Sequence, residues 1–453
     1  MTGTAYVHGV ALSGEALATE LQHRGWRLLL ADDAPTDATR AVAARLGTEL
    51  IERPDADQVE RLVAQADIVC PAPGVPETHI VPAAAIAAGV PLRTEIDLAY
   101  DWEQERPGGP RPMLGVTGTD GKTTTTLLAA HLAASGGHRV AAVGNTETPL
   151  VAALHDPVDV FVVECSSFRL NWIDSFRAEA SVWLNLAPDH QNWHRSLDHY
   201  IAAKARMWAH RRAGDVAVGF ADDPVVMSHL AAAGGVTRTF AATGADYRRE
   251  GSLLVGPQGA IAAVEQLPRQ LPHDVTNTLA AMALVLETGL ATVEQVAAAL
   301  PTFRHPAHRI EPVGELRGVR WFNDSKATTP HAARTAIRSF ERVVLLAGGR
   351  NKGLDLASLA AEHDHVVAVV GLGESAPEVV EAFAPHCPTA TAGSMSEAVE
   401  LADGLAEPGD VVLLSPACAS FDWYPTGGYP ARGADFTRLV AELVARGEGR
   451  RAS

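Results

Sequence analysis

The residues 115–123 have the types and spacing that bind a nucleotide phosphate. They read Gly-Val-Thr-Gly-Thr-Asp-Gly-Lys-Thr and precede a stretch of helix-forming residues, 124–134. A glycine-rich turn at the start of a helix directs backbone N–H groups and the positive end of the helix dipole toward one point, where an anion binds. The sequence therefore predicts that Lys122 contacts the β- and γ-phosphates and that the Thr123 hydroxyl ligates Mg²⁺. The alternative is a turn that is glycine-rich for conformational reasons alone.

Acidic, imidazole and amine side chains follow the next two apolar strands. Glu164 ends the strand 158–164, and His190 follows the strand 180–186, with Lys204 further along the chain. In an open α/β sheet the carboxyl ends of the strands face the ligand crevice, where a carboxylate can hold Mg²⁺ against a phosphate. We therefore predict that Glu164 and His190 are metal ligands; a capping glutamate and a structural histidine are the alternatives.

Parallel sheets are required to position these residues. The order of strands and helices along the chain predicts three such sheets. In the first hundred residues, short apolar strands at 5–7 and 27–31 alternate with helical stretches, which indicates a parallel α/β sheet. The turn 8–14 after the first strand retains only two glycines of the dinucleotide fingerprint. A dinucleotide site, a nucleotide-sugar site and a plain strand-to-helix turn all remain open for it.

Two segments predict linkers between domains: 101–112, which is rich in proline and glycine, and 301–306, which begins and ends with proline. A chain of 453 residues also suggests three domains, at roughly 150 residues per domain. We predict an α/β protein with a Rossmann-like N-terminal domain (1–102), a central P-loop ATPase-like parallel-sheet domain (103–304) and a C-terminal Rossmann-like α/β domain (305–453).

The composition excludes several partners. A net charge of −17 opposes binding to nucleic acid or to an anionic lipid surface. The four cysteines lack metal-ligand spacing and favour a reducing compartment. Neither a secretory signal nor an apolar run of about 18 residues is evident. We therefore expect a cytoplasmic protein without membrane insertion that binds small molecules, and we expect it to be a monomer.

The phosphate loop and seven further motifs occur in the order seen in the Mur ligase superfamily, whose enzymes join amino acids to carboxylates. The order most resembles the D-glutamate-adding branch of this superfamily. The motifs are Glu-x-Ser-Ser-Phe, Asn-Leu-x-x-Asp-His, Tyr-x-x-Ala-Lys, His308-Arg309, Asn-Asp-Ser-Lys-Ala-Thr (323–328), Gly-Gly-Arg-Asn-Lys-Gly (348–353) and Leu-Ser-Pro-Ala-Cys-Ala-Ser-Phe-Asp (414–422). The resemblance implies ATP and two Mg²⁺ ions as cofactors, and UDP-N-acetylmuramoyl-L-alanine and D-glutamate as substrates.

The resemblance also implies roles for individual residues. The implied catalytic residues are Lys122, Glu164, His190 and Lys204. The implied metal ligands are Thr123, Glu164, His190 and Lys204, the last as a carbamylated lysine, because a carbamate turns a cation into an anion that a metal attracts. The implied ATP contacts are Gly118, Thr119, Asp120, Gly121, Lys122, Thr123, Thr124, Asn277, Arg309 and Asp324. The implied contacts to the UDP-muramoyl substrate are Ser13, Gly14, Asp32, Asn145 and Ser166. The implied amino-acid pocket consists of Lys326, Thr328, Lys352, Ser420 and Phe421.

Three positions and one connection depart from the pattern of this superfamily. Asp120 stands where asparagine is common in the phosphate loop, and Arg169 stands where glutamine is expected after Ser-Ser-Phe. Ala72 replaces a common serine in the uridine site. The connection after Asp422 is also longer than usual, which makes the amino-acid pocket harder to place than the ATP site.

The implied reaction activates the carboxylate, which is a poor electrophile and does not condense with an amine in neutral water. The L-alanine carboxylate attacks the γ-phosphorus of ATP, and the glutamate amine then attacks the acyl phosphate, with closure of the third domain over the nucleotide. A variant that adds L-glutamate, a folate-polyglutamylating ligase and a catalytically idle nucleotide-binding protein are the alternatives. The nucleotide-sugar-like first domain opposes the folate ligase, and the retained Thr123, Glu164, His190 and Lys204 oppose the idle protein.

Overall fold

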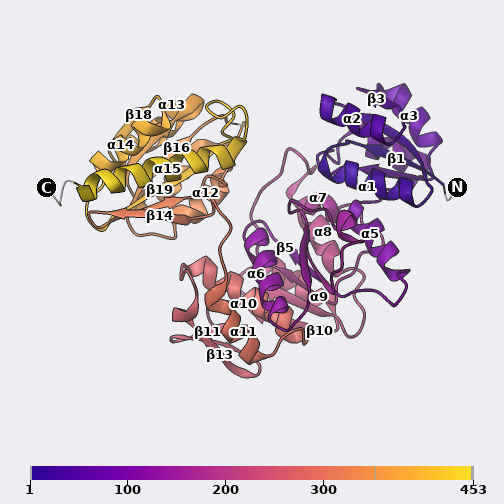
Figure 1. Cartoon of the computed structure of the whole chain (residues 1–453), viewed down its shortest axis with the longest axis horizontal. Coiled ribbons are helices and arrows are strands. Elements are labelled where there is room, and N and C mark those ends of the chain that lie inside the picture. Colours follow the sequence, from indigo (N-terminus) through magenta and orange to yellow (C-terminus); the bar gives the residue numbers. More distant parts are fainter. Residues whose placement is uncertain (1–2, 352, 450–453) are drawn as a thin grey trace. The chain divides into compact units, whose positions relative to one another are not determined.

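The computed structural model describes residues 3–351 and 353–449 (Figure 1). The chain forms two compact units, and the division between them falls between Phe303 and Arg304. The first unit contains two separate parallel sheets, and the second unit contains one largely parallel sheet. These sheets confirm the predicted α/β class. The boundary near residue 102, inside the first unit, stays a prediction.

The first sheet has four parallel strands in the order β3-β2-β1-β4. Its strands are β1 (Thr4–His8), β2 (Arg27–Asp32), β3 (Leu50–Glu52) and β4 (Ile68–Pro71). The helices of this region are α1 (Leu12–His23), α2 (Asp37–Arg45), α3 (Ala56–Ala64), α4 (Ile80–Ala88) and α5 (Glu95–Gln104). Apolar side chains on both faces of these strands pack against the helices, as expected for a parallel sheet.

The helix α5 runs through part of the segment that the sequence predicts as a linker. Its last turn ends at Gln104, so the irregular connection is shorter than 101–112. The reason is a buried ion pair at 2.7 Å between Arg111 and Glu103, which is reinforced by the Arg111 backbone N–H donating to the same carboxylate. Proline and glycine predicted an irregular connection in this segment, but they could not show that its first residues complete a packed helix.

The second sheet has six parallel strands in the order β10-β9-β8-β5-β7-β6. Its strands are β5 (Met113–Thr117), β6 (Val140–Gly144), β7 (Val160–Glu164), β8 (Ala180–Trp183), β9 (Val216–Phe220) and β10 (Val236–Phe240). The helices are α6 (Lys122–Ala134), α7 (Ser167–Leu170), α8 (Leu197–Ala205), α9 (Pro224–Ala233), α10 (Pro272–Glu287) and α11 (Val293–Ala299). A small antiparallel sheet, which the sequence did not predict, consists of β11 (Arg248–Glu250), β12 (Leu253–Gly256) and β13 (Gly259–Ala263).

The sheet of the second unit has the order β14-β15-β19-β16-β17-β18, and only its edge strand β14 is antiparallel. The strands are β14 (Glu311–Leu316), β15 (Val319–Asn323), β16 (Val343–Gly348), β17 (Val366–Leu372), β18 (Thr389–Ala392) and β19 (Val411–Ala417). The helices are α12 (Pro330–Ile337), α13 (Ala376–Phe383), α14 (Met395–Leu405) and α15 (Gly428–Gly449). Within the described residues, we find no helix whose length and apolar character would let it cross a membrane.

Candidate active site

The predicted phosphate loop lies at the centre of the six-stranded sheet. It connects β5 to α6, and β5 pairs with β7 on one side and with β8 on the other. Glu164 is the last residue of β7, and Asn145 directly follows the neighbouring strand β6. Because the carboxyl ends of parallel strands meet at one edge, the fold brings the loop, Glu164 and Asn145 together.

Side chains from outside the loop hold its backbone in place. The N–H groups of Thr119 and Asp120 both donate to the Asn185 side-chain oxygen, at 3.0 and 2.9 Å. Gly121 precedes α6 with a φ of +80°, and a Cβ at this position would lie 2.5 Å from the Asn277 side-chain oxygen. Asn277, predicted to contact ATP, is thus packed directly against the phosphate loop.

Replacing Gly121 by alanine should weaken ATP binding. The substitution strains a left-handed backbone and drives Cβ into Asn277. A strain of roughly 1–3 kcal/mol corresponds to an increase in KM for ATP of about 5-fold to 140-fold. Gly137→Ala is the matched control, because Gly137 follows the other end of α6 with a φ of +90° and nothing lies within 4 Å of its Cβ position. Steady-state kinetics should show the KM effect for Gly121→Ala alone; equal effects in both variants would exclude the contact with Asn277 as its cause.

Two lysine side chains meet on one carbonyl oxygen of the loop. The Nζ of Lys122 donates to Gly118 O at 2.9 Å, and the Nζ of Lys204, from α8, donates to the same oxygen at 2.6 Å. The Lys204 side chain is fully buried, and its Nζ also lies 4.6 Å from the centre of the Tyr200 ring. Burial and the nearby charge of Lys122 lower the pKa of Lys204 well below its usual value. Among the described residues, no carboxylate forms an ion pair with it.

These lysines belong to a very small set. Only four of the 37 basic residues are lysines: Lys122, Lys204, Lys326 and Lys352. All other positions use arginine, which stays protonated and presents a planar fork, whereas lysine offers a compact amine whose pKa shifts readily on burial. The four lysines coincide with positions that the sequence analysis assigned to the site. The small number of lysines is a sequence signal that the comparison of motifs did not use.

Glu164 has one satisfied and one unsatisfied carboxylate oxygen. Its Oε1 accepts a hydrogen bond of 2.8 Å from the Asn145 amide, whereas its Oε2 is buried and has no partner within the described residues. A buried carboxylate oxygen without a donor is costly unless a ligand or ion occupies it. Glu164 therefore fits a cation that binds through Oε2.

His190 lies in a strained turn beside an aromatic cluster. Its φ is +55°, which is uncommon for a residue other than glycine, and its ring centroid lies 4.6 Å from that of Phe168. Burial lowers the pKa of His190 to about 4. The imidazole is therefore neutral at pH 7 and keeps the nitrogen lone pair that a metal ligand needs. Strained turns of this kind concentrate at functional sites.

The residues predicted for the nucleotide-sugar site lie at the carboxyl ends of β1 and β2. Gly14 allows α1 to approach the preceding turn, since a Cβ there would lie 1.9 Å from Gly9 O. The Asp32 carboxylate accepts N–H groups of Val10 and Ala34, both at 2.9 Å, so it organises the two turns that border the crevice.

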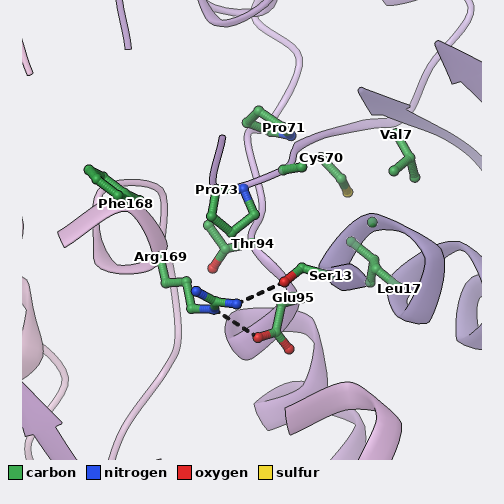
Figure 2. Close-up of a pocket in the computed structure, with 12 residues that line it drawn as sticks. Val7, Ser13, Leu17, Cys70, Pro71, Pro73, Thr94, Glu95, Phe168 and Arg169 are labelled. Carbon is green, nitrogen blue, oxygen red and sulfur yellow. Dashed lines mark hydrogen bonds and ion pairs between the residues drawn. The ribbon is translucent and has the colours of Figure 1, made fainter. Parts of the chain in front are cut away.

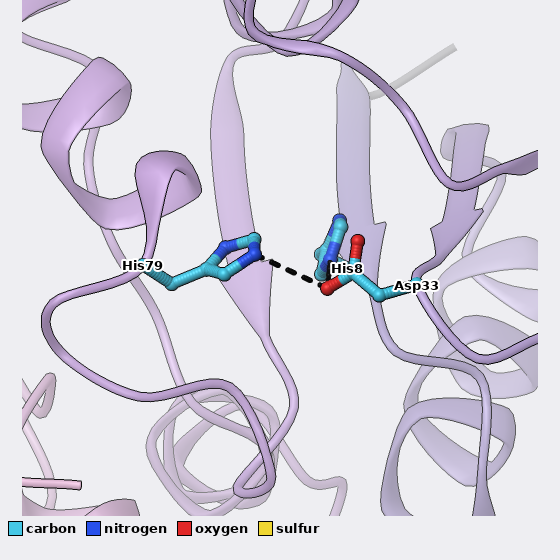
Figure 3. Close-up of side chains that lie close together, drawn as sticks. All are labelled: His8, Asp33 and His79. Atoms are coloured by element: carbon cyan, nitrogen blue, oxygen red, sulfur yellow. Dashed lines mark hydrogen bonds and ion pairs between the residues drawn. The ribbon is translucent and has the colours of Figure 1, made fainter.

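Figure 3 shows three further side chains at this edge, His8, Asp33 and His79, which the sequence analysis did not select. One Asp33 oxygen lies 2.9 Å from Nε2 of His8 and 3.1 Å from Nε2 of His79. Their ligand atoms lie within 4.8 Å of one another. However, the Nδ1 of His79 accepts the Val81 N–H at 3.3 Å, which leaves the proton on Nε2, where it is donated to Asp33. The trio is therefore satisfied by hydrogen bonds without an ion.

A pocket of about 310 Å³ lies between the first helix and the segment that follows Glu164 (Figure 2). Its polar lining residues include Ser13, Thr94, Glu95 and Arg169. The Thr94 hydroxyl is buried without a hydrogen-bond partner in the described part of the chain. Ser166, predicted to contact substrate, lies just before Arg169 and caps the short helix α7 by accepting the Arg169 N–H. Of the residues predicted for the muramoyl substrate, Ser13 and Gly14 line this pocket.

In the second unit, three neighbouring strands carry the predicted amino-acid pocket. The loops after β15, β19 and β16 contain Lys326 and Thr328, Ser420 and Phe421, and Lys352, respectively. Lys326 Nζ lies 4.1 Å from the centre of the Tyr429 ring, and Ser420 is buried with its hydroxyl unpartnered in the described residues. Phe421 is 51% exposed. Lys352 lies outside the described residues.

Arg432 is a buried cation in this unit that the sequence analysis missed. It donates to Ser325 and to the Cys418 carbonyl, but within the described residues its Nη1 has no partner. Burial lowers its pKa to about 10. It lines a pocket of about 170 Å³ together with Asp422. Nothing in the motifs distinguished this arginine from the many others in the chain.

The residues predicted to orient the nucleotide from the second unit lie where its backbone is strained. Arg309 is flanked by His308 and Ile310, whose φ values are +61° and +46°. Asp324 is buried and accepts hydrogen bonds from the Ser415 hydroxyl at 2.8 Å and from Ile310 N at 3.2 Å. The carboxylate of Asp324 thus stabilises the turn that presents Arg309.

Comparison with known proteins agrees with this arrangement. Residues 116–285 match the Mur ligase middle domain, and residues 308–418 match the Mur ligase glutamate ligase domain. The chain therefore belongs to the Mur ligase family, as its motifs predicted. Among solved structures, a UDP-N-acetylmuramate-alanine ligase from Thermotoga maritima has the same fold, with a TM-score of 0.58, 18% identity, and coverage of 97% of this chain and 100% of that one.

Relatives with closer sequences carry a more specific name. A UDP-N-acetylmuramoylalanine–D-glutamate ligase from Frankia casuarinae is 38% identical over 96% of this chain and 93% of that protein. A protein of the same name from Mycolicibacterium vanbaalenii is 36% identical over 97% of this chain and 98% of its own length. These relatives match nearly the whole chain, including the first sheet, which the two family domains do not cover.

Proposed function

We propose that this chain is an ATP-dependent ligase that adds D-glutamate to UDP-N-acetylmuramoyl-L-alanine and thereby contributes to peptidoglycan precursor synthesis. The relatives named for this reaction support the substrate assignment. The observation that carries the proposal is that Lys122 and Lys204 meet on one carbonyl oxygen of the phosphate loop, which follows β5, beside the strand β7 that ends at Glu164. In the proposed reaction the substrate carboxylate attacks the γ-phosphorus and ADP leaves, which gives an acyl phosphate. The amine of glutamate then attacks the acyl carbon, loses a proton and displaces phosphate.

The chain's own residues perform positioning and charge neutralisation. The loop N–H groups and Lys122 bind the nucleotide phosphates, after the Lys122 amine has exchanged its present carbonyl partners for phosphate oxygens. Ser13, Asn145 and Ser166 orient the muramoyl-alanine arm so that its carboxylate faces the γ-phosphorus. Holding both reactants in this geometry supplies most of the rate acceleration, and no protein nucleophile is required.

The site also fits two Mg²⁺ ions. The Glu164 oxygen that lacks a partner and the neutral His190 imidazole are suitable ligands, with Thr123 and a carbamylated Lys204 completing the set. When bound, Mg²⁺ supplies neutralisation of the charge on the transferring phosphoryl group. The burial of Lys204 and its lowered pKa favour the carbamate, because CO₂ reacts with an uncharged amine.

We further propose that Lys326, Thr328, Lys352, Ser420 and Phe421 bind the incoming glutamate. Glutamate carries two carboxylates, and a buried hydroxyl together with lysine amines suits them. The Ser420 hydroxyl lacks a partner in the described residues and is available for such a ligand. We also propose that the protein is a cytoplasmic monomer whose partners are small molecules only.

An isotope transfer experiment tests this function. The enzyme receives ATP, Mg²⁺, D-glutamate and UDP-muramoyl-L-alanine labelled with ¹⁸O in both carboxylate oxygens. The proposal predicts that one ¹⁸O atom per turnover appears in the released phosphate, because the carboxylate oxygen that attacks phosphorus leaves with it. Unlabelled phosphate would show that water attacks ATP and that the chain is not this ligase.

A further inference from the structure

Arg169 joins three side chains that lie far apart in the sequence. Its Nε donates to Glu95 at 3.1 Å, its Nη1 to the Asn145 oxygen at 2.7 Å and its Nη2 to the Ser13 hydroxyl at 2.8 Å. Figure 2 shows the contacts with Glu95 and Ser13 at the wall of the pocket. Both Arg169 and Glu95 are buried. This charge stands where the family pattern has a neutral glutamine.

Asn145 extends this network to Glu164. Its amide nitrogen donates to Glu164 Oε1 at 2.8 Å, and its amide oxygen accepts from Arg169. An amide group can be rotated to exchange its oxygen and nitrogen, but a guanidinium can only donate and a carboxylate can only accept. With Arg169 on one side and Glu164 on the other, only one orientation of the Asn145 amide satisfies both partners.

We infer that Arg169 is a positioning residue, which fixes the Asn145 amide so that Asn145 occupies Glu164 Oε1 and leaves Oε2 directed to the metal. Glu95 anchors the guanidinium, and Glu95 in turn accepts the Val151 N–H at 3.2 Å. A glutamine at position 169 both donates and accepts, so it would tolerate either orientation of Asn145. The inference rests on the proposed role of Glu164 as a metal ligand.

Metal affinity measured without turnover tests the inference. Mn²⁺ replaces Mg²⁺ and its binding to the enzyme in the presence of ADP is followed by electron paramagnetic resonance. We expect Arg169→Gln to raise the Mn²⁺ dissociation constant about tenfold, a typical effect of removing an outer partner of a metal ligand. Arg169→Lys, which still only donates, should restore part of the affinity.

Two further variants separate positioning from a purely structural role. Arg169→Gln combined with Glu95→Gln removes the uncompensated buried charge, so it should fold while keeping the weak Mn²⁺ binding. Arg111→Gln is the matched control, because Arg111 is a buried arginine paired with Glu103 that makes no contact with Asn145 or Glu164. It should lower the thermal unfolding midpoint and leave Mn²⁺ affinity unchanged.

A double variant tests whether Arg169 acts through Asn145. If it does, Asn145→Ala with Arg169→Gln should bind Mn²⁺ no more weakly than Asn145→Ala alone, since the second change has nothing left to orient. Additive losses, or Mn²⁺ affinity within twofold of the wild type in Arg169→Gln, would overturn the inference. A normal affinity in Glu164→Gln would instead contradict the metal assignment in the proposed function.

Discussion

Lys204→Ala should retain its fold and lose nearly all ligase activity. Removing one preorganised electrostatic group typically lowers kcat by about 10²–10³-fold, and we expect the upper end of this range because the carbamate would hold a metal ion as well. A short carboxylic acid added to the assay should restore part of the rate, because its two oxygens can occupy the space of the carbamate. Bicarbonate should act in the same way. Phosphate release with and without these additives measures the effect.

The variant Lys204→Arg tests whether the carbamate, and not the positive charge, is required. It keeps a positive charge on a slightly longer side chain, but a guanidinium stays protonated and does not form a carbamate. We therefore expect it to be as inactive as Lys204→Ala. Because the chain contains so few lysines, a ¹³C-bicarbonate spectrum of the wild type should show one carbamate signal that both variants lack. Near-wild-type activity in either variant would make Lys204 an ordinary helix lysine.

Lys352→Ala should raise the KM for D-glutamate by roughly a hundredfold or more. Truncating one partner of a largely desolvated charge pair costs about 2–5 kcal/mol, at about 1.4 kcal/mol per tenfold change. The KM values for ATP and the muramoyl substrate should change little, because Lys352 belongs to the predicted amino-acid pocket. Steady-state kinetics with each substrate varied in turn separates the three constants.

Arg350→Ala is the matched control from the same loop. Arg350 is exposed and forms a surface ion pair at 2.6 Å with Glu374. Exposed pairs contribute little, so this variant should keep a normal KM for D-glutamate. A Lys352→Ala variant whose main defect is in ATP binding would place Lys352 in the nucleotide site instead.

Much of the first unit could be predicted because its chemistry follows strand ends. Glu164 closes a buried apolar strand, and the phosphate loop opens a helix, so a local pattern was sufficient to place both at the same sheet edge. The same rule predicted the layout of the second unit. The antiparallel sheet β11–β13 escaped prediction because its strands span only three to five residues.

The interactions that tune the site could not be predicted in the same way. Arg169 was noticed as a departure from the family pattern, but its partners Ser13 and Glu95 are 156 and 74 residues away in sequence. The contact of Lys122 and Lys204 with the same carbonyl oxygen depends on how α8 packs against the loop. Such contacts are set by tertiary packing, which periodicity and motif spacing do not encode.

The most direct test of the proposed function is a substrate-omission assay with both enantiomers of glutamate. Purified enzyme receives ATP, Mg²⁺ and UDP-N-acetylmuramoyl-L-alanine, with D-glutamate and L-glutamate in separate reactions, and phosphate release is followed. We predict sustained release only when the muramoyl substrate and D-glutamate are present together. Equal or faster release with L-glutamate would contradict the stereochemical assignment, and release without the muramoyl substrate would contradict the ligase function itself.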